Sequence, residues 1–264
     1  MIRLAERHAK FAAPLIVGIL MLAFWEAVVR INAIPPYILP GPILVAETLW
    51  RDGPSLLISL WVTLRITGAA LIAAVVLGGA IAVLFAQSRL LELSFFPYAV
   101  ILQVTPIVAI APLIIIWVNN TFLSLLLCAW IVAFFPVVAN TTLGLNSADR
   151  NLVALFRLYG ASRWQMLRHL RLPSALPYFL AGVRISGGLA LIGAVVAEFV
   201  AGTGGTETGL ASRILEAGYR LEIPKLFAAL LLLSLAGILI FAILSWLSRA
   251  LLAHWHESAL PTDE

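Results

Sequence analysis

The stretch Asp149–Pro177, DRNLVALFRLYGASRWQMLRHLRLPSALP, decides how the rest of the chain must be arranged. It is basic and amphipathic, and no acidic residue follows Asp149 within it. Its cationic residues are Arg150, Arg157, Arg163, Arg168 and Arg171. Apolar segments lie on both sides, so we expect an exposed loop between two membrane helices. Arginine-rich loops are retained in the cytoplasm, where this one is expected to meet a partner.

The composition excludes an ordinary soluble domain. The 264 residues are 62% hydrophobic and 11% charged, whereas soluble domains carry about 25% charged residues. The net charge of +4 comes from loops beside apolar segments, and these form no basic face interleaved with aromatic residues, so no nucleic-acid partner is expected. The single cysteine, Cys128, excludes a disulfide framework and a thiolate cluster. His169, His254 and His256 lack the spacing of a metal site, and no metal is expected.

Six stretches are long and apolar enough to cross a bilayer, which takes about 20 helical residues. They cover approximately residues 11–30, 60–86, 93–118, 121–145, 175–200 and 226–248. We therefore expect an all-α membrane protein with six transmembrane helices, in which residues 1–264 form a single domain. Only Asn119 and Asn120 separate the third stretch from the fourth, which predicts a tight helical hairpin. The first stretch is interpreted as a retained span, because no cleavage site follows it.

The distribution of cations predicts the orientation. With the N-terminus in the cytoplasm, ten cationic residues lie in the inner segments and five in the outer segments, where five acidic residues offset them. Because cationic loops stay on the cytoplasmic side, both termini are expected to be cytoplasmic. The inverted orientation is the alternative.

Local signals within the inner loop, residues 146–174, predict a helix that ends at a glycine. Asp149 is a suitable N-cap, and the helix is expected to run to about Tyr159. Gly160 follows, and glycine readily adopts the left-handed conformation in which many helices terminate.

A second helix is predicted directly after this turn. Ser162 and Gln165 have the spacing of a capping box. The apolar residues expected on one face of this helix are Trp164, Leu167 and Leu170. Leu172-Pro173 is expected to end the helix before the next span. Together the two helices form an elbow with an apolar root and a cationic surface.

Two outer segments are also expected to be structured. Residues Ile43–Trp50 lie between proline- and glycine-containing turns and predict a short amphipathic helix at the membrane interface. A second helix is predicted to start at Thr208 or Gly209. Its apolar face is expected to hold Leu210, Ile214 and Leu215.

The inner loop resembles the cytoplasmic loop of binding-protein-dependent ATP-binding-cassette (ABC) importer permeases. Their pattern runs Glu-Ala-Ala, three residues, glycine, nine residues and Ile-x-Leu-Pro. Gly160 stands at the glycine, Leu170 at the isoleucine, and Leu172-Pro173 at the Leu-Pro. The Glu-Ala-Ala positions, residues 154–156, hold Ala-Leu-Phe, so the acidic residue of the pattern is absent. The glycine and Leu-Pro positions, which shape the elbow, are in register.

The flanking sequences extend the resemblance over about residues 24–255. LPSALPYFLAGVRISGGLA, the following VVAEF, and LPGPILVAETL near the start resemble the nitrate, sulfonate and taurine branch of these permeases. Relatives that carry pyrimidine or riboflavin-type vitamin precursors belong to the same group. The resemblance therefore indicates a class of small polar solutes without selecting one of them.

The resemblance implies a fold of the methionine-importer-permease type, also called type I. It implies that two copies form the pore, that two cytoplasmic ABC ATPase subunits bind below, and that a solute-binding protein docks outside. In such permeases the short helix after the motif glycine inserts into a groove of the ATPase, which here is about Ala161–Leu170. The residues assigned to this docking element are Gly160, Ala161, Ser162, Arg163, Trp164, Leu167, Leu170, Leu172 and Pro173.

The energy source is expected to lie in the partner. The chain has no glycine-rich phosphate loop followed by Lys-Ser/Thr, so it is not expected to bind ATP in that way, to hold a cofactor or to contribute catalytic residues. A rigid elbow attached to two spans is a suitable lever for ATP-driven alternating access. The alternative is that the basic surface binds anionic membrane lipid only.

A pathway for the solute is predicted in the third span. Gln103 and Thr105 place polar groups at membrane depth, and Pro106 and Pro112 free backbone carbonyls, a pattern tolerated where a helix lines a cavity. A packing kink explains the same residues equally well. Glu198, near the outer end of the fifth span, is a further pathway candidate, with a structural role as its alternative.

Arg65 and Arg184 also lie within predicted spans. Charges inside spans are candidate functional residues, but both are expected to have structural roles, such as reaching the membrane interface or pairing with a carbonyl.

The function predicted from these observations is that of a homodimeric permease subunit of an ATP-driven importer in a prokaryotic inner membrane. The main alternative is an ion- or proton-coupled secondary transporter. That class needs titratable groups at the membrane midplane and usually contains inverted repeats. Midspan carboxylates and repeats are both missing from the sequence.

Overall fold

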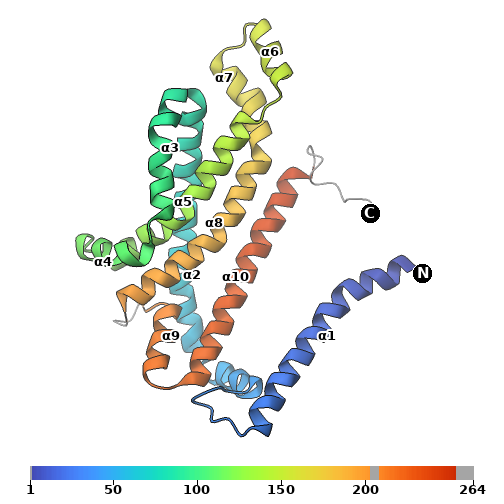
Figure 1. The fold of residues 1–264 in the computed structure, drawn as a ribbon, viewed down its shortest axis with the longest axis vertical. Helices are drawn as coiled ribbons and strands as arrows, with labels where there is room; N and C mark the ends of the chain where they lie inside the picture. Colours follow the sequence, from blue (N-terminus) through green and yellow to red (C-terminus); the bar gives the residue numbers. More distant parts are fainter. Residues whose placement is uncertain (1, 203–207, 254–264) are drawn as a thin grey trace.

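The computed structural model describes the backbone of residues 2–202 and 208–253 and, within these, the side chains from Ala12 onward. His254 and His256 lie outside the described residues. The helices are α1 (Ile2–Ile31), α2 (Pro42–Gln87), α3 (Arg89–Val104), α4 (Ile107–Trp117), α5 (Thr121–Asn146), α6 (Arg150–Leu158), α7 (Arg163–Met166), the π-helical segment η1 (Leu167–Arg171), α8 (Leu172–Ala201), α9 (Leu210–Tyr219) and α10 (Ile223–Leu252) (Figure 1). The part of the chain that the structure describes is thus all-helical, as predicted.

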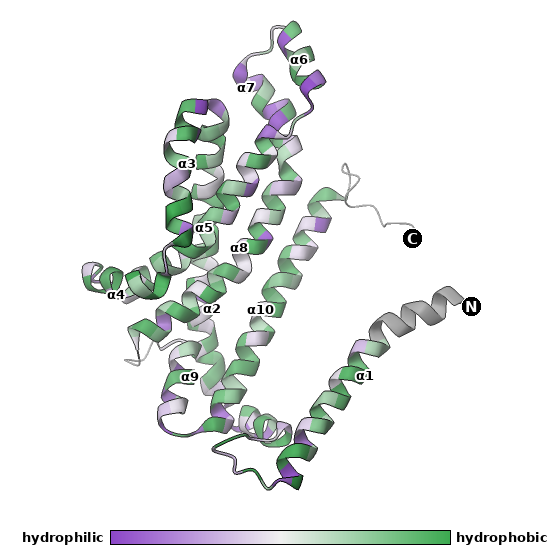
Figure 2. Cartoon of the chain, viewed as in Figure 1, coloured by the Kyte–Doolittle hydropathy of each residue, from purple (hydrophilic) through white to green (hydrophobic). Residues whose placement is uncertain are grey.

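Within the described residues, five helices are long and apolar enough to cross a membrane, and the bent pair α3–α4 makes a sixth candidate span. Figure 2 shows that hydrophobic residues dominate these helices, whereas hydrophilic residues gather at α6 and α7 at one end and around α9 at the other. The expected distribution of polar segments between the two ends of the bundle is therefore present.

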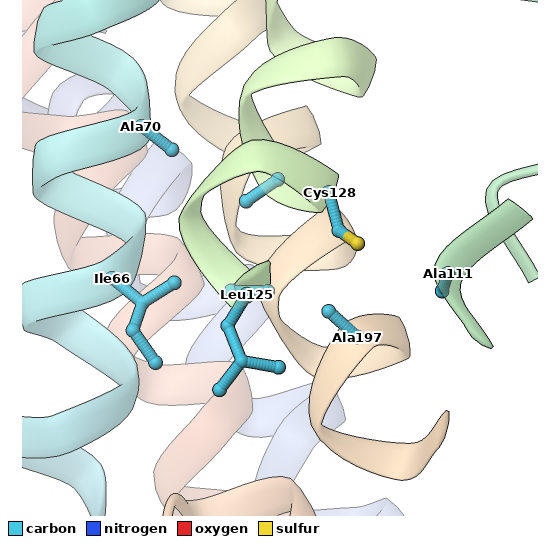
Figure 3. Packing of buried hydrophobic residues seen from close by; sticks show 8 residues of the cluster. Ile66, Ala70, Ala111, Leu125, Cys128 and Ala197 are labelled. Carbon is cyan, nitrogen blue, oxygen red and sulfur yellow. The ribbon is translucent and has the colours of Figure 1, made fainter. Parts of the chain in front are cut away.

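The centre of the bundle is formed by α2, α5 and α8. Figure 3 shows Ile66 of α2 beside Leu125 of α5. Cys128, also of α5, and Ala197 of α8 lie close by. Cys128 is fully buried in this cluster, which fits its interpretation as a small apolar residue. α10 packs along α2 and α8, whereas α1 stands apart from the bundle and contacts it mainly near the end that holds α9 (Figure 1).

Small residues bring α5 and α8 close together along their length. A Cβ atom at Gly144, Gly182 or Gly193 would lie 2.7–2.8 Å from atoms of the other helix. Ser186 Oγ donates a hydrogen bond to the Ala133 carbonyl at 2.6 Å across the same contact. This packing joins α5 and α8 into one unit, and these are the two spans that the α6–α7 elbow connects.

The predicted interfacial helix Ile43–Trp50 is not separate, because it forms the first turns of the 46-residue helix α2. Pro54 lies inside α2, and a proline that removes one hydrogen bond bends a helix without necessarily ending it. Figure 1 shows these first turns running across the direction of the rest of α2. Trp50 is 90% exposed there, as suits an aromatic residue at a membrane interface.

The predicted third span, residues 93–118, is broken into two helices. α3 and α4 meet at 99° across Thr105 and Pro106. Thr105 has an extended conformation with ψ 122°, because the residue before a proline is driven out of the helical region. α4 therefore turns away from α3, and Asn120 then caps α5 by accepting a hydrogen bond from Leu123 N at 2.9 Å.

Candidate functional site

The elbow, residues 147–171, begins with a capped helix and a tight glycine turn. Asp149 accepts hydrogen bonds from the N–H groups of Asn151 and Leu152 and so caps α6. Gly160 has φ +68°, with its N–H donating to Arg157 O and the next N–H, that of Ala161, donating to Phe156 O, both at 3.0 Å. This pair of bonds is a Schellman motif, which favours glycine. The cap and the turn confirm the sequence prediction.

The second helix of the elbow starts at the predicted capping box. Ser162 Oγ accepts from Gln165 N at 3.2 Å, and Gln165 Oε1 accepts from Ser162 N at 2.7 Å. The predicted stop at Leu172-Pro173 is wrong, because α7 continues through η1 directly into α8. Pro173 lies in this continuous helix, two residues after the π-helical segment η1. α7, η1 and α8 are therefore one continuous rod.

The root of the elbow is buried in the bundle. Leu167 is 1% exposed and packs with Ala82 of α2, Leu145 of α5 and Ala175 of α8. Leu170 and Met166 are also buried. Trp164, predicted to share this face, is instead 64% exposed and lies about one helical turn before Leu167, on the side of the tip. The root of the elbow thus contacts three spans at one point.

Arg171 ties the root to the end of α2. Its Nη1 donates to the Ala86 carbonyl at 2.8 Å, near the end of α2, where the last carbonyls have no partner within the helix. Arg171 was predicted to lie on the cationic surface, and its contact with the Ala86 carbonyl was not predicted. The only sequence feature that could have indicated this contact is the position of Arg171 just before a span.

The tip of the elbow presents apolar side chains to its surroundings. Leu158 and Tyr159 are each 85% exposed, and Trp164 accompanies them. Between α6 and α7 lies a cavity of about 450 Å³ lined by Leu155, Phe156, Tyr159, Gly160, Ala161, Gln165 and His169. Large exposed apolar patches occur at protein–protein and membrane interaction sites. Leu155 and Phe156, which stand at the two alanine positions of the Glu-Ala-Ala pattern, line this cavity.

The predicted pathway residues do not form one site. Gln103 is exposed on α3, and Thr105 is half-buried with its Oγ1 donating to Ile101 O of its own helix at 2.6 Å. Pro106 is exposed at the bend before α4. Glu198 lies apart from them, since its contacts are with α2 and α9. The break at Pro106 agrees with both interpretations of that segment, the pathway and the kink.

Glu198 is a buried structural carboxylate within the protomer. It is 1% exposed, its Oε1 accepts from Thr63 Oγ1 at 2.8 Å, and its Oε2 accepts from Ala211 N at 2.9 Å. Thr63 Oγ1 in turn accepts from Leu210 N at 2.8 Å. The two side chains thus bind the first free N–H groups of α9, where a negative charge is favourable. No local pattern in the sequence indicates the contribution of Thr63.

The two arginines within spans have aromatic partners. The guanidinium of Arg65 lies 5.7 Å from the ring centroid of Phe122, and that of Arg184 lies 5.8 Å from the ring centroid of Phe241. Both distances are within the range of cation–π contacts. These contacts support the structural roles expected for both residues.

At the end of the bundle opposite the elbow, α9 carries the predicted apolar face and an ionic face with salt bridges (Figure 1). Leu210 and Ile214 are buried against α2 and α10. Glu216 contacts Arg213 Nη1 and Arg220 Nη2, both at 2.8 Å. The hydrogen bond from Arg213 lowers the pKa of the Glu216 carboxyl from its usual 4.5, partial burial opposes this shift, and the charges of Arg220, Arg213 and Lys225 lower the pKa further.

The sequence of residues 74–253 matches the family model of the binding-protein-dependent transport system inner membrane component. The chain belongs to this family. It is a permease by family, in agreement with the resemblance of its inner loop. Among relatives, the riboflavin transport system permease protein RibX of Chloroflexus aurantiacus is 38% identical over 90% of this chain and 88% of its own length. The formylaminopyrimidine transport permease protein ThiX of Halalkalibacterium halodurans is 33% identical over 94% of this chain and 97% of its own length.

A more distant relative is the taurine transport system permease protein TauC of Escherichia coli, 29% identical over 89% of this chain and 86% of its own length. Solved structures of an amino acid ABC transporter and of the MetNI methionine ABC transporter match with TM-scores of 0.63 and 0.61, each at 19% identity. They cover 77% and 74% of this chain and 97% and 95% of their own chains, respectively. The expected methionine-importer-type fold is confirmed.

Proposed function

We propose that this permease is the membrane-spanning subunit of an ABC importer in a prokaryotic cytoplasmic membrane, with both termini in the cytoplasm. Two copies form the solute pathway, two ABC ATPase subunits bind the elbows, and a solute-binding protein delivers the solute outside. The membership of the family supports this assignment. ATP is bound and hydrolysed in the partner, and the permease contributes conformational change only.

The observation that carries the proposal is the elbow, which combines an exposed apolar tip with a buried root. Trp164 and Tyr159 offer aromatic anchors of the kind that dominate protein interfaces. Leu167 holds the same rod within the core of three spans. When the ATPase dimer moves the tip, α8 follows as a rigid continuation of α7, and α5 follows through its close packing on α8. This couples nucleotide-driven motion to the pathway.

The solute proposed is a small polar heterocyclic vitamin precursor. The relatives named for riboflavin and formylaminopyrimidine are 38% and 33% identical to this chain, whereas that named for taurine is 29% identical. Nitrate, alkanesulfonates and taurine are the competing solutes. Mass spectrometry of the molecule that co-purifies with the cognate solute-binding protein distinguishes them.

The coupling role is tested by co-purification with an ABC ATPase of the same genome that carries GxxxxGK[ST]. Trp164→Ala and Gly160→Val are expected to release the ATPase, the first by removing an anchor and the second because valine strongly disfavours positive φ. Gly160→Asn is the matched variant, since asparagine tolerates this conformation, and it is expected to retain the ATPase. Retention of the ATPase by both Trp164→Ala and Gly160→Val contradicts the proposal.

The alternative, an ion- or proton-coupled secondary transporter, is tested in vesicles. The permease reconstituted alone is expected to move no solute uphill under a proton or sodium gradient. Addition of the ATPase, the solute-binding protein and ATP is expected to start uptake. Uphill transport by the permease alone would show that it is a secondary transporter and that ATP hydrolysis is not its only source of energy.

A further inference from the structure

Beside the root of the elbow lies a second cavity, which shares Ala161 and Arg163 with the proposed ATPase-docking element. It has a volume of about 410 Å³ and is lined by Ala86, Gln87, Arg157, Ala161, Arg163, Met166 and Arg171. Three of these are arginines, contributed by α6, α7 and η1. No carboxylate of the described side chains lies within 4 Å of any of them. The cavity is therefore a concentration of positive charge without an internal counterion.

An apolar groove follows this cavity into the bundle. The groove has a volume of about 390 Å³ and is lined by Val75, Val76, Gly79, Ala80, Val83, Thr141, Leu172, Ala175, Leu176 and Phe179. Arg171 of the cavity and Leu172 of the groove are consecutive residues, and Val83 lies about one helical turn from Ala86 and Gln87. The helix positions 75, 76, 79, 80, 83, 86 and 87 share one face of α2 by their spacing. The basic cavity and the apolar groove are thus neighbours along α2 and at the junction of η1 and α8.

We propose that this combined site binds an anionic glycerophospholipid of the cytoplasmic leaflet. The arginines bind the phosphate of the headgroup, for which guanidinium groups are well suited. The groove between α2 and α8 receives the first part of an acyl chain. The site lies at the ends of membrane-spanning helices, which is the depth of lipid headgroups, and anionic lipids attract basic groups there.

The apolar groove favours a lipid over a free phosphate. Apart from Thr141, its lining residues carry no polar side chain, and burying an acyl chain against such residues is favourable. Inorganic phosphate has no apolar part to place there.

A second copy of the chain is a less suitable occupant of the same site. The arginines call for a negatively charged partner, and the described acidic side chains nearest to the elbow already have partners. Glu92 pairs with Arg89, and Asp149 caps α6. A lipid phosphate supplies the missing charge without removing either contact.

The test is native mass spectrometry of the purified full-length permease in non-ionic detergent, with phosphatidylglycerol and phosphatidylcholine of equal chain length as probes. The permease is expected to retain phosphatidylglycerol about fivefold more tightly than phosphatidylcholine, because phosphatidylglycerol carries one net negative charge that interacts with the basic residues. Arg157→Gln/Arg171→Gln is expected to abolish this preference. Arg150→Gln/Arg168→Gln, which removes two exposed charges of the elbow outside the cavity, is expected to keep it. Equal retention of both lipids by the wild type, or an unchanged preference in the first double variant, overturns the proposal.

The groove is tested independently of the arginines. Gly79→Leu is expected to fill it, because a Cβ there meets only Phe179, at 3.7 Å, and to weaken phosphatidylglycerol retention severalfold. sn-Glycerol 3-phosphate, which has the phosphate but no acyl chain, is expected to compete poorly. Competition as strong as that of phosphatidylglycerol identifies a soluble-anion site and overturns the assignment to lipid.

The occupant in the assembled transporter is identified by photo-cross-linking from p-benzoylphenylalanine introduced at Ala80, in the groove. An adduct with the mass of phosphatidylglycerol supports the proposal. A covalent adduct between two copies of the permease shows that a second copy covers the groove and overturns it.

Discussion

Thr63 Oγ1 donates to Glu198 Oε1 at 2.8 Å, although the two residues are 135 positions apart. The pair joins α2 to α8 and caps α9, because Thr63 Oγ1 accepts from Leu210 N and Glu198 Oε2 accepts from Ala211 N. All of these groups are buried. The end of the bundle opposite the elbow therefore depends on one hydroxyl and one carboxylate, which bind each other and the first N–H groups of α9.

Thr63→Val is expected to destabilise the permease by about 1–3 kcal/mol, because it leaves Leu210 N and one Glu198 oxygen without their buried partner. Thr67→Val is the matched control. Thr67 is equally buried one turn along α2, but its Oγ1 donates only to the Thr63 carbonyl of its own helix. Thermal unfolding in detergent is expected to shift to a lower temperature for Thr63→Val than for Thr67→Val. Equal shifts would contradict a role of Thr63 in capping α9.

Gly209→Ala is expected to destabilise the same region by a steric mechanism. A Cβ at this position would overlap the Glu198 carboxylate, which must then leave its hydrogen bonds. In the double variant Gly209→Ala/Glu198→Ala the overlap is removed, so the two effects are expected to be less than additive. The measurement is a double-mutant cycle of unfolding temperature or midpoint. Strict additivity would show that the two positions do not interact.

Predictions from the sequence succeeded where the signal was local. Asp149, Gly160 and the Ser162–Gln165 pair act on backbone groups no more than three residues away, so their spacing alone predicts the cap, the turn and the box. The Thr63–Glu198 pair could not be predicted in this way, because it depends on how α2 and α8 meet. The same holds for Arg171 and the Ala86 carbonyl, 85 residues apart.

Prolines show why helix ends were predicted less well. Pro54 lies within α2, Pro106 separates α3 from α4, and Pro173 lies in the first turn of α8. All three prolines lack a backbone N–H group. The helix nevertheless continues through Pro54 and, after the π-helical segment η1, through Pro173, whereas it ends before Pro106, where Thr105 is extended. The burial of Trp164 was also predicted wrongly. Helical periodicity identifies residues that share a face, but it does not show how far the neighbouring helices extend to cover that face.

The ionic face of α9 predicts a dependence of stability on pH. Arg213 and its basic neighbours lower the pKa of Glu216 from 4.5, so the folded state binds this proton less readily than the unfolded state. The resulting stabilisation is present above pH 4.5 and is lost as the pH falls through the lowered folded-state pKa. Unfolding temperatures of the wild type are expected to fall over this acidic range, and Glu216→Gln is expected to reduce the fall. Glu47→Gln, which removes an exposed carboxylate outside these ion pairs, is expected to leave the fall unchanged, and equal profiles for all three proteins would contradict the role of Glu216.

The separation of tip and root in the elbow predicts that two apolar residues three positions apart affect different properties. Leu167→Ala removes a side chain that is 1% exposed and is expected to cost about 2–5 kcal/mol, because it leaves a cavity between α2, α5 and α8. Trp164→Ala removes a side chain that is 64% exposed, so the unfolding temperature of the isolated permease is expected to change little. The order is expected to reverse for ATPase binding at a temperature where both variants are folded, with Trp164→Ala losing more affinity. If Leu167→Ala and Trp164→Ala instead lowered stability and ATPase binding in parallel, the elbow would be a single structural element, and the division into an anchoring root and a docking tip would be wrong.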